Sequence, residues 1–123
     1  MQNDDRALFL MKKYGDGLYR FAYILTLSDE AAGRIFSDAF ADVTGKMLMT
    51  ESDKDDRKTL FAHIYKNAVK CKTNGIYREE KYGAKSDTFN EIIRLPLKER
   101  AINHLMIYEE MTEQEAKEVT GGK

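Results

Sequence analysis

The sequence predicts an all-α protein in which a small helical bundle is followed by a second helical module. Only one proline, Pro96, occurs in 123 residues, and no run of β-branched residues alternates with polar ones as it does in strands. Apolar residues recur instead at the i, i+3, i+4, i+7 spacing of a helix face, as in Leu18, Phe21, Ala22 and Leu25. These two features exclude a sheet-based fold.

The first 75 residues are predicted to form a four-helix bundle. A first helix follows Asp4 and Asp5 and ends near Gly15 and Gly17, and the stripe from Leu18 marks the second. Ser28 begins the third helix, because Asp29 and Glu30 behind this capping residue suit the positive end of a helix dipole. This helix is expected to bury the apolar residues Ala31, Ile35, Ala39, Phe40, Val43 and Met47.

Residues 50–57 contain no apolar side chain and are predicted to form a solvated loop. The fourth helix is marked by Leu60, Phe61 and Ile64 and is expected to end near Asn74-Gly75. Residues 76–87 show no clear period and are interpreted as a linker.

Residues 88–123 are predicted to form three short helices. Pro96 suits the first turn of the middle one, and Thr112 with Glu115 forms a capping box that opens the last, which ends at Gly121. This piece is too small to bury a core of its own. We therefore expect it either to pack against the bundle or to expose an apolar patch that drives self-association; the residues concerned are Ile102, Leu105, Met106 and Ile107.

The composition favours a cytoplasmic globular protein. Hydrophobic residues make up 42% and charged residues 33% of the chain, and no stretch reaches the length of a membrane span. The acidic start Met1–Arg6 does not resemble a signal peptide, and the lone Cys71 excludes an internal disulfide framework.

Positive charge is concentrated in the middle of the chain. Residues 57–85 carry eight Lys/Arg against two Asp/Glu, whereas residues 1–56 carry seven against eleven and residues 86–123 five against eight. Such a basic segment either binds an anionic partner or neutralises its acidic neighbours within the fold.

No pattern of residues predicts catalysis, a metal site or a cofactor. His63 and His104 lie on separate predicted helices without a ligand pattern, so each is interpreted as a surface or packed residue. Cys71 has no histidine partner within reach in the sequence. The acidic pairs Asp55-Asp56 and Glu109-Glu110 are interpreted as helix-end or solvent-facing charge.

Three stretches resemble the extracytoplasmic-function group of bacterial RNA polymerase sigma factors. Residues 32–43, Ala-Gly-Arg-Ile-Phe-Ser-Asp-Ala-Phe-Ala-Asp-Val, resemble the family's Ala-Glu-Asp-Ile-x-Gln-Glu-x-Phe-x-x-Val. Residues 60–67, Leu-Phe-Ala-His-Ile-Tyr-Lys-Asn, are similar to its Trp-Leu-x-x-Ile-Ala-Arg-Asn stretch. Residues 95–100, Leu-Pro-Leu-Lys-Glu-Arg, followed by Met-Thr-Glu-Gln-Glu-Ala at 111–116, resemble Leu-Pro-x-x-x-Arg followed by Leu-Ser-x-x-Glu-Ile-Ala.

The resemblance implies a sigma region 2-like bundle (1–75), a linker (76–87) and a truncated region 4-like module (88–123). In the family, the exposed face of the third helix docks on RNA polymerase core; here that face carries Arg34, Ser37, Asp38 and Asp42. Arg34 replaces the usual acid and Ser37 the usual glutamine, and such changes alter affinity and partner choice. The alternative is that these four residues form an ordinary solvated face.

The resemblance also places promoter DNA at the basic fourth helix. The residues that it implies for DNA binding are Arg57, Lys58, Tyr65, Lys66, Asn67, Lys70, Lys72 and Arg78. Cys71 and Asn74 depart from the family's aspartate and arginine, and the acidic residues of 50–57 would repel phosphate where the family captures a flipped base. The alternative is that the lysines solvate this helix and the tyrosines complete its packing.

The family's recognition helix would follow Lys123, so the upstream promoter box is not expected to be read by these residues. Two hypotheses follow. The chain is a sigma-like transcription initiation protein that binds RNA polymerase core and promoter DNA, or it is a degenerate sigma-fold interaction module with little DNA affinity. Such a module would hold the polymerase, an anti-sigma factor or a second copy of itself.

Overall fold

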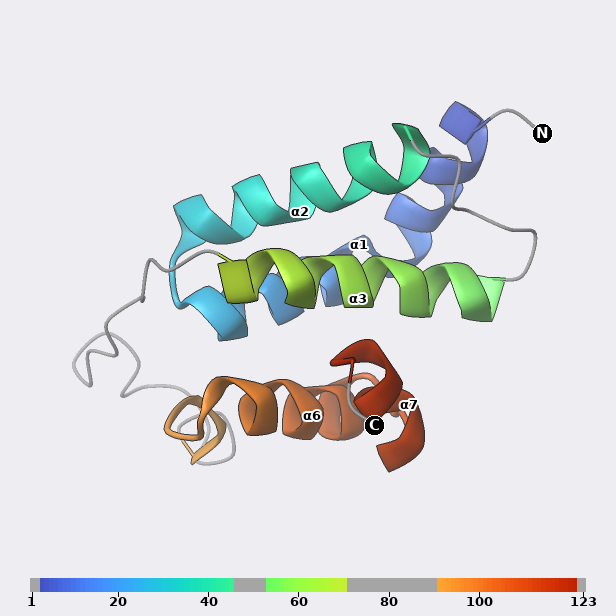
Figure 1. The fold of residues 1–123 in the computed structure, drawn as a ribbon. Helices are drawn as coiled ribbons and strands as arrows, with labels where there is room; N and C mark the ends of the chain where they lie inside the picture. Colours follow the sequence, from blue (N-terminus) through green and yellow to red (C-terminus); the bar gives the residue numbers. More distant parts are fainter. Residues whose placement is uncertain (1–2, 46–52, 71–90, 122–123) are drawn as a thin grey trace.

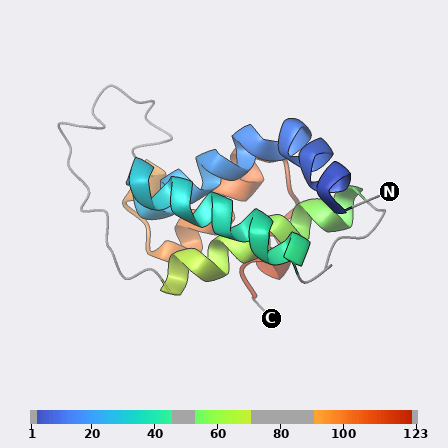
Figure 2. The same cartoon turned by 90° about the horizontal axis from the view of Figure 1, so that it is seen from above.

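The computed structural model describes residues 3–45, 53–70 and 91–121. All regular secondary structure in these residues is helical, which confirms the predicted all-α class. The helices are α1 (Asn3–Thr26), α2 (Asp29–Gly45), α3 (Asp53–Lys70), α6 (Leu97–Tyr108) and α7 (Glu113–Val119). Helices α1, α2 and α3 pack on one another, and α6 and α7 lie on the side of α3 away from α2 (Figure 1, Figure 2).

Helix α1 is continuous where the sequence predicted two helices. The expected end near Gly15 and Gly17 is wrong, because the helix runs through both glycines to Thr26. Two helical glycines cost about 1 kcal/mol each relative to alanine. Burial of Leu10, Leu18 and other apolar residues along this helix offsets that cost.

The corner between α1 and α2 confirms the predicted start of the third helix. Leu27 has a positive φ of 56°, and its amide donates to the carbonyl of Tyr23 over 2.6 Å. The hydroxyl of Ser28 then accepts from the amide of Ala31 over 3.2 Å, which caps α2. The predicted burial of Ala31, Ile35, Ala39 and Phe40 is confirmed, whereas the side chain of Val43 and all of Met47 lie outside the described residues.

Helix α3 begins earlier than the sequence predicted. The interpretation of residues 50–57 as a solvated loop is wrong from Asp53 onward, because α3 starts there and Asp56 is fully buried. Acidic residues are favourable in a first helical turn, and the buried residues Leu60 and Phe61 anchor the helix behind them. The expected end near Asn74-Gly75 and the linker 76–87 lie outside the described residues.

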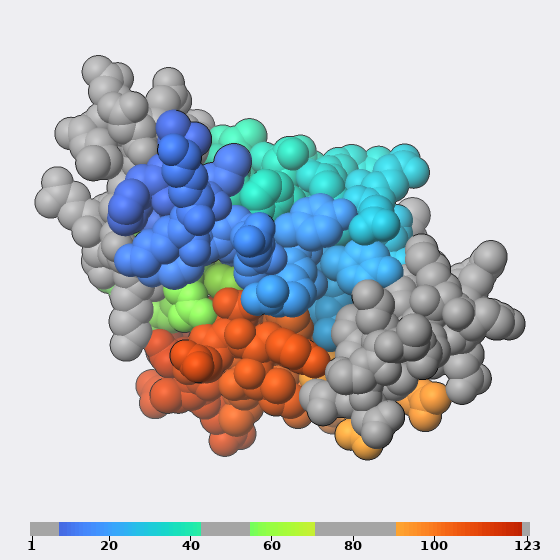
Figure 3. Space-filling view, turned by 180° about the vertical axis from the view of Figure 1, so that it is seen from behind, coloured from blue at the N-terminus to red at the C-terminus, as the bar shows by residue number. Residues whose placement is uncertain are grey.

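One hydrophobic core joins the N-terminal and C-terminal helices. Its large, fully buried side chains come from α1, α3, α6 and the helical residues 91–93: Phe21, Phe61, Leu10, Leu18, Ile24, Leu60, Ile64, Ile93 and Leu105. Helix α6 lies directly against α1, as the view from behind shows (Figure 3), and α7 packs against α3 and α6. The expected packing against the bundle is therefore observed, although Met106 and Ile107 stay exposed on α6.

Arg100 attaches α6 to the end of α1. Its guanidinium donates to the carbonyl of Ile24 over 3.2 Å and to that of Leu95 over 3.2 Å. These carbonyls include one from the last turn of α1, which has no basic residue of its own. Arg100 thus supplies the positive charge that the negative end of a helix dipole favours. Burial lowers the pKa of this guanidinium.

The C-terminal helix begins as the sequence predicted. The amide of Glu115 donates to the Thr112 hydroxyl over 3.1 Å, and the amide of Thr112 donates to the Glu115 carboxylate over 3.0 Å. This reciprocal pair is the predicted capping box. Gly121 then adopts a φ of +70° at the predicted stop. Among the described residues, no helix combines the length and apolar character that crossing a membrane requires.

Candidate functional site

The outer face of α2 carries three of the four predicted polymerase-binding residues. Arg34, Ser37 and Asp38 are exposed, whereas Ile35 and Phe40 on the other face are buried. The fourth, Asp42, is half-buried and its carboxylate lies 3.0 Å from Nδ1 of His63. Helix α2 therefore presents a polar face to solvent, while its apolar face packs into the core.

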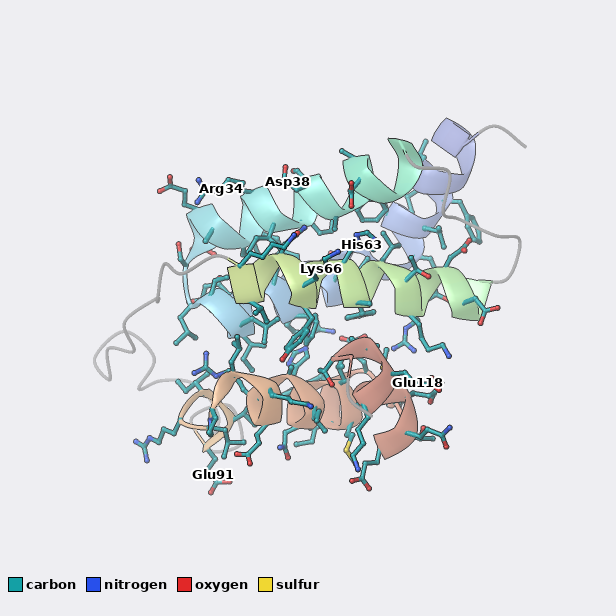
Figure 4. All side chains as sticks on the ribbon, in the orientation of Figure 1. Arg34, Asp38, His63, Lys66, Glu91 and Glu118 are labelled. Carbon is teal, nitrogen blue, oxygen red and sulfur yellow. The ribbon has the colours of Figure 1, made fainter. Side chains whose placement is uncertain are left out.

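A groove between α2 and α3 brings the two sets of predicted site residues together. It has a volume of about 510 Å³ and is lined by Asp38, Ala41, Asp42, His63, Lys66, Asn67 and Lys70. Figure 4 labels Arg34 and Asp38 on α2 and His63 and Lys66 on the neighbouring α3. Residues predicted to bind polymerase thus share a surface with residues predicted to bind DNA.

The groove has mixed charge. Asp38 and Asp42 contribute carboxylates, Lys66 and Lys70 contribute ammonium groups, and both lysines are exposed. The carboxylates line the same groove as the lysines and therefore reduce the attraction of this surface for phosphate. A mixed surface of this kind suits a protein partner at least as well as a polyanion.

Arg57 and Lys58 lie on the opposite side of α3, facing the C-terminal helices. The guanidinium of Arg57 donates to the Glu109 carbonyl over 2.7 Å and lies 3.3 Å from its carboxylate. The ammonium of Lys58 lies 3.0 Å from the carboxylate of Glu118, and this hydrogen bond raises the pKa of Lys58. The predicted DNA-binding cations therefore do not share one face, and two of them neutralise acidic residues of the C-terminal part.

The remaining predicted DNA-binding residues differ in position. Asn67 is half-buried in the groove, whereas Tyr65 packs against the core and burial raises its pKa. Its ring is therefore less available for stacking on a base than the sequence implied. Lys72 and Arg78 lie outside the described residues.

Glu109 is the centre of an ionic cluster that the sequence did not predict. Its carboxylate lies 3.2 Å from the guanidinium of Arg20 and 3.3 Å from that of Arg57, and the side chain is only 10% exposed. Glu109 lies at the C-terminal end of α6, which agrees with its interpretation as helix-end charge, but its side chain does not face solvent. The cluster borders a cleft of about 850 Å³, whose lining residues are Lys13, Tyr14, Asp16, Gly17, Arg20, Arg57, Tyr108, Glu109, Glu110 and Glu115.

Aromatic rings and a glycine shape this cluster. The Arg57 guanidinium lies 5.6 Å from the ring centroid of Tyr14 and 5.4 Å from that of Phe61, both within cation–π range. Gly17 leaves room for Glu109, because a Cβ at this position would lie 2.8 Å from its carboxylate. Gly17 therefore permits a close approach between α1 and the end of α6.

His104 is a packed residue, as predicted, and it borders the same cluster. It is 1% exposed, packs against the rings of Phe21 and Tyr108, and has Nε2 3.9 Å from the Glu109 carboxylate. Neither ring nitrogen has a hydrogen-bond partner within the described residues. Burial, aided by the charge of Arg20, lowers its pKa to about 3, so the imidazole is neutral near pH 7.

Sequence reasoning missed Glu109, Arg20 and Arg100 because their contacts are distant along the chain. Glu109 meets Arg20 and Arg57 at sequence separations of 89 and 52 residues, so no local pattern marks them. Arg100 had a signal, since it ends the Leu-Pro-Leu-Lys-Glu-Arg stretch that carries the family resemblance.

A comparison of the chain with protein-family models, with curated proteins and with solved structures found no match. The residues and contacts described above are therefore the basis for assigning a function.

Proposed function

We propose that this chain is a sigma-factor-like transcription initiation protein. It docks on RNA polymerase core through the outer face of α2 and contacts promoter DNA through the second half of α3. The observation that carries the proposal is the groove in which Asp38 and Asp42 of α2 meet Lys66, Asn67 and Lys70 of α3. A partner bound to α2 would hold nucleic acid within reach of these lysines.

The geometry of α2 supports the docking step. Its apolar residues are buried beneath the helix, so Arg34, Ser37 and Asp38 can change partners without loss of the core. Charged residues at such a surface set partner choice more than they set affinity. This property suits a protein that must compete with other factors for one docking site.

The polymerase contact is tested by reversing one charge. We expect Asp38→Arg to fold like the wild type and to lose binding to bacterial RNA polymerase core in a pull-down. Glu91→Arg is the matched control, because Glu91 is also exposed but lies far from α2 (Figure 4). Equal capture of both variants would exclude this face of α2 as the docking surface.

The DNA contact is tested by salt titration. We expect the double variant Lys66→Ala, Lys70→Ala to bind fluorescein-labelled single-stranded DNA more weakly, measured by fluorescence anisotropy. Loss of two phosphate contacts reduces the slope of log K against log salt by about 1.4. Lys12→Ala, Lys98→Ala is the control, since both lysines are exposed on other helices. The same slope in both double variants would contradict the proposal.

A second candidate function is a sigma-fold interaction module with little DNA affinity. The pairing of Arg57 and Lys58 with Glu109 and Glu118 favours it, because these cations already have carboxylate partners. Polymerase capture without DNA binding at low salt would support this candidate over the first. Its partners would then be the polymerase, an anti-sigma factor or a second copy of the chain.

A further inference from the structure

We propose that the C-terminal helices act as an internal cover that keeps Arg57 and Lys58 away from phosphate. Their carboxylates occupy the positions on α3 where nucleic acid phosphates would otherwise bind. This inference rests on the proposed function, since it assigns a regulatory role to one end of the same basic helix.

Two separate contacts form the cover. At the first, Arg57 is only 20% exposed and donates to both the backbone carbonyl and the carboxylate of Glu109. At the second, Lys58 meets the carboxylate of Glu118 on α7 at 3.0 Å. Both carboxylates come from residues that follow position 108, so one movement of the chain after α6 would release both cations.

The local charge explains why the cover excludes DNA. Three carboxylates act on Lys58, namely Asp55 of its own helix and Glu115 and Glu118 of α7. With α7 in place the surroundings of Lys58 are net negative, and phosphate is repelled. When α7 leaves, Glu115 and Glu118 leave with it, and the carboxylates that remain near Arg57 and Lys58 are those of the first turn of α3.

The contacts of α7 are suited to reversible release. The helix spans only Glu113–Val119 and buries few residues, among them Ala116 and Val119. The ion pair with Lys58 is partly exposed, with side-chain exposures of 29% and 48%, so salt and competing phosphates weaken it. The Glu109 contacts are more buried and hold the end of α6 more firmly.

The cover is tested by neutralising Glu118 and comparing it with a matched residue of α7. Glu118→Gln frees Lys58, whereas Glu113→Gln removes the same charge from the same helix and, among the described residues, disturbs the pair with Lys117. We expect Glu118→Gln to bind labelled single-stranded DNA about threefold more tightly than Glu113→Gln at low salt. This gain in DNA affinity should disappear in the double variant Lys58→Ala, Glu118→Gln.

Amide hydrogen exchange gives a second, independent readout. We expect single-stranded DNA to raise exchange in residues 113–119 of Glu118→Gln and to leave α2 unchanged. Equal DNA affinity of the two single variants, a gain that survives Lys58→Ala, or unchanged exchange in α7 would each overturn the cover. The outcome is distinguishable from that of the proposed function, which depends on Lys66 and Lys70 in the groove.

Discussion

Replacement of Gly17 by alanine tests the ionic cluster at the junction of α1 and α6. In an exposed helix interior, Gly→Ala raises the free energy of unfolding by about 1 kcal/mol. At Gly17, however, the new Cβ would lie 2.8 and 2.9 Å from the two carboxylate oxygens of Glu109. Real Cβ atoms do not tolerate such distances, so the carboxylate has to move away from Arg20 and Arg57.

The size of the effect follows from the bonds that move. A hydrogen bond to a charged group contributes about 1.5–3 kcal/mol when it is partly buried. Since Arg20 is half exposed, we take about 2 kcal/mol for the loss at Glu109. Gly17→Ala is therefore expected to lower the free energy of unfolding by about 1 kcal/mol, after the gain in helix propensity of about 1 kcal/mol.

Two matched variants isolate the cause. Gly15→Ala places a Cβ at ordinary contact distances of 3.6 Å from Met11 and 3.8 Å from Phe36, and Gly33→Ala meets nothing within 4 Å. Both are expected to stabilise the protein by about 1 kcal/mol. Urea unfolding, monitored by circular dichroism, measures the free energy of unfolding of all three variants. We expect the value for Gly17→Ala to lie about 2 kcal/mol below those of the two controls.

A double-mutant cycle identifies the atoms responsible. In a Glu109→Ala background the carboxylate is absent, so Gly17→Ala should stabilise by the same amount as Gly15→Ala. If Gly17→Ala stabilises the wild type as much as Gly15→Ala does, Glu109 does not lie against this glycine and the cluster is misplaced.

Two further predictions concern the C-terminal helices. Thr112→Ala should lower the free energy of unfolding by about 1 kcal/mol because the capping box is lost, whereas Thr112→Ser should keep most of that stability. Urea unfolding of the two variants measures the difference, and equal losses would contradict the cap. Burial lowers the pKa of His104 to about 3, so only the unfolded chain binds its proton between pH 6.5 and 3. The stability contributed by neutral His104 is fully present above pH 6.5, and the free energy of unfolding should fall by about 1.4 kcal/mol per pH unit below it. The variant His104→Leu should flatten this dependence on pH. An unchanged slope would contradict the lowered pKa of His104.

Exposed apolar residues on α6 bear on the expected self-association. Met106 and Ile107 are 41% and 50% exposed, whereas Leu105 between α6 and the core is fully buried. The helix thus keeps its core face covered by α1 and leaves a small apolar surface outside. A surface formed by two such side chains is smaller than the patches that usually mark stable interfaces.

The features that the sequence alone predicted are those that depend on residues close together in the chain. Helix periodicity gave the all-α class, and the caps at Ser28 and Thr112 form because their hydrogen bonds join residues three positions apart. The left-handed turn at Gly121 follows from the same short-range logic. The buried half of α2 was also predictable, because one helix face carries its apolar residues.

Only the tertiary structure decided the continuity of α1, the burial of Glu109 and the side of α3 to which each cation points. Gly17 weakens an isolated helix by about 1 kcal/mol relative to alanine, but here it admits a carboxylate held by two arginines from distant parts of the chain. Arg57 and Lys66 belong to one basic segment, yet one faces Glu109 and the other the groove beside α2. Such choices depend on energies of contact between residues far apart in sequence, and a local pattern does not contain them.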